Sequence, residues 1–166
     1  MPFKNILNNI YLGDQFSLNL IDHQCELKIG DIYYNILNSK KEYNYKNQYF
    51  ILSGDKMAIN MKDSHDPDDF CNDLFVPAIK FLIENSEKTN IYTHCQLGVS
   101  RSASTIFIFL VVMKVLPHDN FKQALKKYIK DFYPYMKLNL GVYKFLENNF
   151  PFKEIANKMN TNWGDL

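Results

Sequence analysis

The segment His94-Cys95-Gln96-Leu97-Gly98-Val99-Ser100-Arg101-Ser102 decides the fold of this chain. Apolar residues predict a short strand at Ile91 to Thr93 before it and a buried helix from Arg101 to about Leu116 after it. A glycine-containing loop between a strand and a helix N-terminus turns successive backbone N–H groups inward and forms a nest for a tetrahedral oxyanion. The segment therefore predicts an anion-binding loop within an α/β domain.

Three side chains of this segment suit nucleophilic chemistry on a bound oxyanion. Cys95 stands at the start of the loop, and a helix N-terminus or a nearby cation lowers the pKa of a thiol, so we expect a thiolate nucleophile there. Arg101, six residues later, can curl back over the loop and bind two phosphate oxygens bidentately. Ser102 can donate to the sulfur and ease its departure. The residues expected to surround the phosphate are Gln96, Leu97, Gly98, Val99, Ser100 and Arg101.

Composition supports the special place of Arg101, because it is the only arginine among 19 basic residues. A background that uses lysine almost everywhere retains arginine where a planar fork of donors is needed. The 18 acidic residues leave a net charge of +1, which indicates neither a basic face for nucleic acid nor one for a membrane. We expect a partner to be recognised locally.

The three cysteines are widely spaced and include no C-x-x-C pair, so neither a disulfide framework nor a zinc site is expected. Cys25 and Cys71 are interpreted as ordinary buried thiols. The N-terminus lacks the apolar run of a signal peptide, and the strongest apolar run, Ala103 to Val115, is too short to span a bilayer. These features favour a soluble cytoplasmic protein without a metal or another cofactor.

The rest of the chain predicts strands first and helices later. The expected strands are Ile6 to Leu12, Asp31 to Leu37, Gln48 to Leu52 and Lys56 to Met61, with a polar loop at Asn38 to Asn47. The expected helices begin near Phe70 after a cap at Asp68 or Asp69, at a cap on Asp119 or Asn120, and at Leu140, the last ending at Asn149. This order predicts one α/β domain with a mixed central sheet of about four to five strands flanked by helices.

The loop resembles the phosphate-binding loop of the cysteine-based protein tyrosine phosphatases. The sequence Arg101-Ser102-Ala103 is similar to the form common in dual-specificity phosphatases, Ile10-Leu12 with Gly13 is like the family's opening strand and turn, and Tyr133 to Phe145 is like its closing segment. The stretch Asp22 to Phe50 matches poorly. The resemblance implies a tyrosine-phosphatase-like catalytic domain at 1–152, followed by a C-terminal tail at 153–166 that could form a short helix.

The resemblance also implies a general acid on a separate loop between a strand and a helix. Asp63 is the first candidate because it follows an apolar strand, and Asp66 is the alternative because counting back from Pro77 without an insertion reaches it. Asn139 resembles an asparagine that supports the catalytic loop, although a loop asparagine is also common turn chemistry.

His94 could be mistaken for a base that partners Cys95. Successive strand residues face opposite sides, so we expect it instead to be buried, to hydrogen-bond the loop backbone and to tune the thiolate.

These residues imply a monomeric phosphatase that acts on phosphotyrosine, and also on phosphoserine or phosphothreonine, through a cysteinyl-phosphate intermediate. The expected partner is a phosphorylated protein, with no nucleic acid or membrane. Two alternatives stay open. One is a phosphatase for a phosphoinositide or an RNA 5′ phosphate, which the uncharged positions between Cys95 and Arg101 disfavour. The other is an inactive phosphate-binding relative, which would need one catalytic part to be missing.

Overall fold

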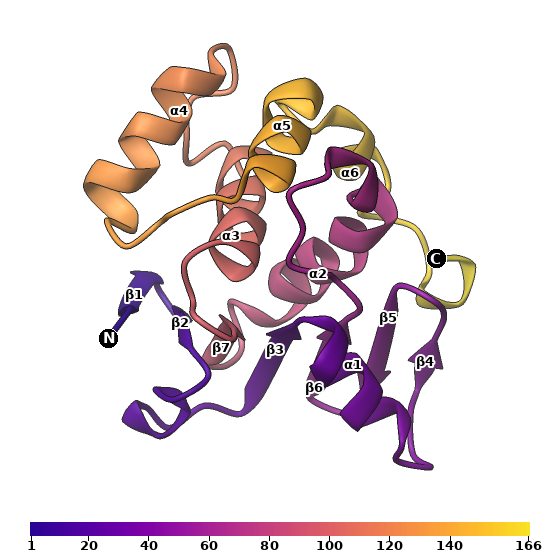
Figure 1. Cartoon of the computed structure of the whole chain (residues 1–166). Helices are drawn as coiled ribbons and strands as arrows, with labels where there is room; N and C mark the ends of the chain where they lie inside the picture. Colours follow the sequence, from indigo (N-terminus) through magenta and orange to yellow (C-terminus); the bar gives the residue numbers. More distant parts are fainter.

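The strand that leads into the loop lies inside a seven-stranded sheet in the computed structural model, which describes every residue from Met1 to Leu166 (Figure 1). The strand order is β1-β2-β7-β3-β6-β5-β4. Strands β2, β7, β3 and β6 pair in parallel, whereas β1, β5 and β4 join antiparallel at the two edges. Parallel strands are buried on both faces, and all five residues of β7 are buried here.

The elements have the following bounds. The strands are β1 (Phe3–Leu7), β2 (Ile10–Asp14), β3 (Cys25–Ile29), β4 (Tyr45–Lys46), β5 (Phe50–Ser53), β6 (Lys56–Ile59) and β7 (Ile91–Cys95). The helices are α1 (Asp31–Asn38), α2 (Asn72–Asn85), α3 (Arg101–Val112), α4 (Phe121–Lys127), α5 (Leu140–Asn149) and α6 (Lys153–Asn157). A π-helical segment, Tyr128–Phe132, continues α4.

The helices form two unequal layers. Helix α3 runs through the main core, where it contacts the sheet and the helices α2, α5 and α6 (Figure 1). Its residues Arg101 to Val111 are all buried, which explains why its sequence is apolar on every side from Ile106 onward. Helix α1 packs on the other face, against β5 and β6. None of the helices combines the length and apolar character that crossing a bilayer requires.

The predicted α/β class and mixed sheet are confirmed, but the sheet has seven strands instead of four or five. The single strand expected at Ile6 to Leu12 is divided between β1 and β2, because Asn8 turns the chain with a φ of 47°. Strand β3 is not among the expected strands, and β4 lies within the stretch expected to be a loop at Asn38 to Asn47. The extra strands therefore come from a turn and from the stretch between residues 22 and 50.

The prediction of a strand at Asp31 to Leu37 is wrong, because this segment forms helix α1. Its tyrosines and isoleucines favour a strand by propensity, but Tyr34 and Leu37 lie three residues apart on one buried helix face. They pack against Ile51 and Ala58 of the sheet. Burial of this helical stripe outweighs the local preference.

Capping residues explain where two predicted helices begin. The side chain of Asn120 accepts from the backbone N–H of Gln123 at the start of α4, and Asn139 accepts from Val142 at the start of α5. Neither Asp68 nor Asp69 caps α2, whose N-cap is Cys71. Instead, Asp66 accepts from Asp68 N and caps a short 3-10 turn, Pro67–Asp69.

The C-terminal residues pack against the rest of the domain. Ile155 of α6 is buried in the main core. The Trp163 ring lies 5.7 Å from that of Phe50, and its Nε1 donates to Glu84 at 3.0 Å. The boundary between a catalytic domain at 1–152 and a tail stays a prediction, because these later residues share the same core.

Candidate active site

Cys95 is the last residue of β7, and the loop that follows it ends where α3 begins at Arg101. In open α/β sheets, ligands bind beyond the carboxyl ends of parallel strands, and the loop occupies that position. The thiol is buried, with a relative exposure of 2%. Ser102 Oγ lies 3.2 Å from Cys95 Sγ and can donate to it. The sequence prediction that these two side chains meet agrees with this geometry.

Gly98 allows the loop to bend against the neighbouring strand. Its φ is +71°, and a Cβ atom there would lie 2.5 Å from the carbonyl carbon of Gly13. On the other side, Tyr133 Oη donates to Gly98 O at 2.8 Å and Lys137 N donates to Val99 O at 2.8 Å. The loop is thus held between β2 and the segment that precedes α5.

Arg101 lies at the first turn of α3, and its side chain is almost completely buried. Its Nη1 donates to Met61 O at 3.3 Å, and its Nη2 lies 3.4 Å from Asp63 Oδ2. The Nε donor is buried and has no hydrogen-bond partner. Gly30 makes room for the guanidinium, since a Cβ there would lie 3.0 Å from Nη1. A planar cation with a free donor beside the loop is suited to gripping an oxyanion.

The structure separates the two candidates for the general acid. Asp63 pairs with Arg101 and accepts from Asn139 Nδ2 at 2.6 Å, while about half of its side chain remains exposed. Asp66 is engaged in capping the 3-10 turn, with Oδ1 3.0 Å from Asp68 N. Asp63 is therefore the carboxylate that the fold brings to the loop.

Asn139 connects three parts of the site. Its amide donates to Asp63, its Oδ1 accepts from Val142 N at 2.9 Å, and its backbone N–H donates to Ser100 Oγ at 3.2 Å. The residue is thus both an ordinary helix cap and a link between the loop and the candidate acid.

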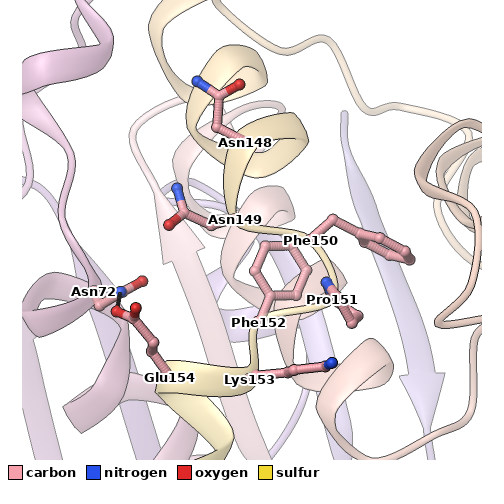
Figure 2. A pocket seen from close by; sticks show the side chains of 8 residues that line it. All are labelled: Asn72, Asn148, Asn149, Phe150, Pro151, Phe152, Lys153 and Glu154. Carbon is pink, nitrogen blue, oxygen red and sulfur yellow. Dashed lines mark hydrogen bonds between the residues drawn. The ribbon is translucent and has the colours of Figure 1, made fainter.

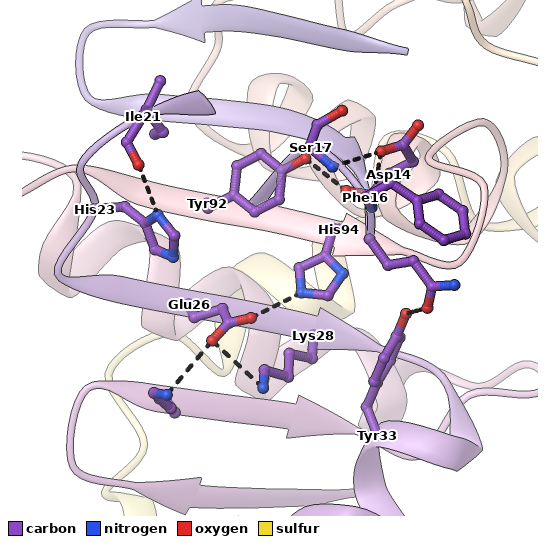
Figure 3. A network of polar contacts seen from close by, with 12 residues as sticks. Asp14, Phe16, Ser17, Ile21, His23, Glu26, Lys28, Tyr33, Tyr92 and His94 are labelled. Carbon is purple, nitrogen blue, oxygen red and sulfur yellow. Dashed lines mark hydrogen bonds and ion pairs between the residues drawn. The ribbon is translucent and has the colours of Figure 1, made fainter. Parts of the chain in front are cut away.

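His94 points away from Cys95, but it does not contact the loop backbone as expected. Its Nε2 lies 3.0 Å from Glu26 Oε1, and its Nδ1 is buried without a partner (Figure 3). The reason is the strand alternation of β7, which directs His94 to the face of the sheet where β3 places Glu26. Sequence reasoning missed this carboxylate because β3 lies in the poorly matched stretch.

A cavity of about 480 Å³ opens beside the loop. It is lined by Gln15, Asp31, Ile32, Tyr33, Lys62, Asp63, Gln96 and Arg101. Tyr33 Oη donates to Gln15 Oε1, and Gln15 N donates to Gln96 O at 3.4 Å. Burial, followed by the nearby charge of Cys95, raises the pKa of Tyr33 to about 12, so its hydroxyl remains a donor at neutral pH. No local pattern points to Tyr33, because the composition of its segment favours a strand.

A second cavity, of about 280 Å³, lies where α5 ends and α6 begins (Figure 2). Three of its eight lining residues are asparagines, and Asn72 Nδ2 donates to Glu154 Oε2 at 2.6 Å across it. It contains no pairing of a nucleophile with an acid or a base. Nor does the structure contain any group of three His, Cys, Asp or Glu residues that could hold a metal ion.

Comparison with known proteins places the fold of this chain among phosphatase structures. No family model and no curated protein sequence matches the chain. DUSP15 superposes with a TM-score of 0.64 at 15% identity over 99% of this chain and 98% of its own. A leucine-rich-repeat and phosphatase-domain-containing protein from Entamoeba histolytica gives 0.62 at 18% identity over 97% and 96%. The chain has the dual-specificity phosphatase fold.

A further structure of this fold class is that of PTPMT1 in complex with PI(5)P. It superposes with a TM-score of 0.56 at 12% identity and covers 96% of this chain and 97% of its own. At such identities the likeness establishes the fold, and the chemistry has to be argued from the chain's own residues.

Gly98→Ala is expected to abolish binding of tungstate, an oxyanion probe, measured by isothermal titration calorimetry. The new methyl group would collide with Gly13 and would force the loop open. Gly54→Ala is the matched control, because Gly54 also has a positive φ, of 61°, but no atom lies within 4 Å of the place its new methyl group would take. That variant should lose only about 1 to 2 kcal/mol of folding stability, the cost of a left-handed alanine, and should bind tungstate normally. Equal binding by both variants would show that the loop does not depend on this bend.

Proposed function

We propose that this chain is a cysteine-dependent protein phosphatase that hydrolyses phosphotyrosine, and also phosphoserine and phosphothreonine, through a cysteinyl-phosphate intermediate. The convergence of Ser102, Arg101 and Asp63 on the loop that begins at Cys95 carries this proposal. These are the four parts that nucleophilic attack on a phosphate ester needs: a thiol, a hydroxyl beside it, a cation and an acid.

In the first step, the Cys95 thiolate attacks phosphorus as the bond from phosphorus to the ester oxygen breaks. Backbone N–H groups of the loop and Arg101 hold the phosphoryl oxygens, and Asp63 gives its proton to the departing oxygen. In the second step, Asp63 as carboxylate takes a proton from water, which attacks phosphorus. Inorganic phosphate leaves, and Ser102 donates to the sulfur as the thiolate forms again. Asn139 links the loop, through Ser100, to the acid Asp63.

The cavity favours a substrate with a single phosphate group. The loop positions Gln96, Leu97, Val99 and Ser100 carry no charge. At the mouth, Lys62 is offset by the carboxylates of Asp31 and Asp63. Substrates with several phosphates usually meet clusters of cations, and none is present here.

Exposed apolar side chains beside the cavity support a second class of substrate, a phosphorylated lipid. Phe16, Ile32 and Leu97 are more than half exposed, and each lines the cavity or follows a residue that does. Such a rim suits apolar residues that flank a phosphotyrosine, and it also suits a singly phosphorylated lipid like the ligand in the PTPMT1 structure. A phosphatase for a phosphoinositide is therefore the second candidate.

A substrate panel tests the proposed function directly. The purified protein is expected to release phosphate faster from phosphotyrosine peptides than from phosphoinositide vesicles or 5′-triphosphate RNA, measured as kcat/KM for each. Faster turnover of the vesicles would favour the second candidate. Failure to hydrolyse any member of the panel, together with tungstate binding, would indicate an inactive phosphate-binding protein.

Arg101→Lys is expected to lower kcat/KM more than about a hundredfold, equivalent to about 3 kcal/mol of transition-state stabilisation. Lysine keeps the charge but replaces two parallel N–H donors with one movable ammonium group. Arg101→Met serves as the comparison, and the lysine variant should recover little of what methionine loses. If Arg101→Lys turns over substrate nearly as fast as wild type, bidentate binding of the phosphate by Arg101 is not needed for catalysis.

Asp63→Asn is expected to lose most activity on phosphotyrosine peptides and much less on an activated aryl phosphate ester. A general acid matters most when the departing oxygen is a poor leaving group. Asp66→Asn is the matched control and should show no such dependence, because Asp66 caps a turn. If the leaving-group dependence appears in Asp66→Asn and not in Asp63→Asn, the assignment of the acid is wrong by three residues.

A further inference from the structure

A buried carboxylate lies behind the loop, on the face of the sheet opposite the main helical core. Glu26 of β3 has a relative exposure of 4%, and no part of the proposed reaction uses it. Its Oε1 faces His94 Nε2 at 3.0 Å, while Oε2 faces the ammonium groups of Lys28 at 3.4 Å and Lys56 at 3.8 Å (Figure 3). Buried charges are costly unless they are paired, and this one has three partners.

The charge state of Glu26 follows from these partners. Burial alone would raise the pKa of its carboxyl, but the hydrogen bond with His94 and the cations Lys28 and Lys56 hold the pKa below its ordinary value. Glu26 is therefore a carboxylate at neutral pH and can only accept a hydrogen bond. The proton between the two residues consequently resides on Nε2 of His94.

Glu26 supplies the only hydrogen bond to the His94 ring, because Nδ1 is buried without a partner. The ring is otherwise held by two aromatic neighbours. Tyr92 stacks on it with centroids 5.4 Å apart, and Tyr33 meets it edge-on at 5.1 Å. Without the carboxylate, nothing polar would fix the tautomer or the rotation of the ring.

The orientation of the His94 ring affects the cavity through two sets of connections. His94 is joined directly to Cys95 at the end of β7. In addition, Tyr33 packs against the His94 ring and donates to Gln15, which in turn donates to the backbone of Gln96. A displaced His94 ring would therefore disturb both the start of the loop and one wall of the cavity.

We propose that Glu26 is a positioning residue of this site: by accepting from His94 Nε2–H, it fixes the ring that supports Cys95 and Tyr33. The inference rests on the proposed function, because it assigns Glu26 to the same site. We assign this role to the acceptor at its distance from Nε2, because the two cations that face the charge, Lys28 and Lys56, are partly exposed to solvent. Loss of the carboxylate that orients a metal-bound histidine costs about 10- to 100-fold in affinity or activity, and we take that scale for the same kind of contact at His94.

Two variants separate the acceptor from the charge. Glu26→Gln keeps an oxygen at the same reach and removes the charge, whereas Glu26→Asp keeps the charge and withdraws the oxygen by one methylene. We expect Glu26→Gln to remain within about threefold of wild type in kcat/KM for an aryl phosphate, and Glu26→Asp to lose about tenfold or more. The side-chain Nε2–H signal of His94 in NMR spectra should persist in Glu26→Gln and shift or broaden in Glu26→Asp.

Glu84→Asp is the matched control, because Glu84 pairs with Lys80 and Trp163 away from the cavity. It should change thermal stability without changing kcat/KM. A loss in Glu26→Gln as large as or larger than the loss in Glu26→Asp would overturn the proposal, because the charge would then matter at least as much as the acceptor. Wild-type kcat/KM in Glu26→Asp, per folded molecule, would show that Glu26 only stabilises the fold.

A binding measurement keeps this inference separate from the proposed function. Tungstate should protect Cys95 from alkylation by iodoacetamide, and about tenfold more tungstate should be needed in Glu26→Asp than in Glu26→Gln. If the wild type hydrolyses no phosphate ester, the proposed function fails, while this protection still reports on Glu26. Equal protection in the two variants would overturn the positioning role even in an active enzyme.

Discussion

The rest of the site depends on the tight bend of one loop against its neighbouring strand. Gly98 adopts a positive φ and presses against the backbone of Gly13 and Asp14, so the loop can close between β7 and α3. That closure brings Ser102 to the thiol of Cys95 and starts α3 with its N–H groups facing the loop. Because helix N-termini favour negative charge, we infer that the bend prepares the loop backbone for an anion.

Two buried charged side chains near this loop, Arg101 and Glu26, have defined partners. Arg101 is the single arginine, and it meets Asp63, which Asn139 holds from the other side. Behind the sheet, Glu26 balances Lys28 and Lys56 and orients His94. Buried charges interact strongly because little water screens them. Small displacements of these groups are therefore expected to affect the chemistry more than changes among the many exposed lysines.

The parts of the site that are close in sequence can be predicted from it. Cys95, Arg101 and Ser102 lie within one strand-loop-helix unit, so their spacing alone places them together. The place of Asp63 after an apolar strand favours it over Asp66, and the structure brings it to Arg101. The single-domain α/β class also follows from the order of strands and helices.

The features of the site that the sequence does not predict depend on contacts between residues that are far apart in the chain. Glu26 contacts His94, from which it is 68 residues away in the sequence, and no local pattern predicts such a pair. The tyrosines and isoleucines of helix α1 favour a strand, and only the sheet surface that buries Tyr34 and Leu37 selects the helix. The position of Tyr33 at the cavity cannot be predicted without that helix.

The central claim is that phosphate passes through the sulfur of Cys95. The most direct measurement is mass spectrometry of the protein after rapid acid quenching during turnover of a phosphotyrosine peptide. The account predicts one phosphoryl group on Cys95 and none in Cys95→Ser. A phosphoryl group on a different residue, or full turnover by Cys95→Ser, would contradict it.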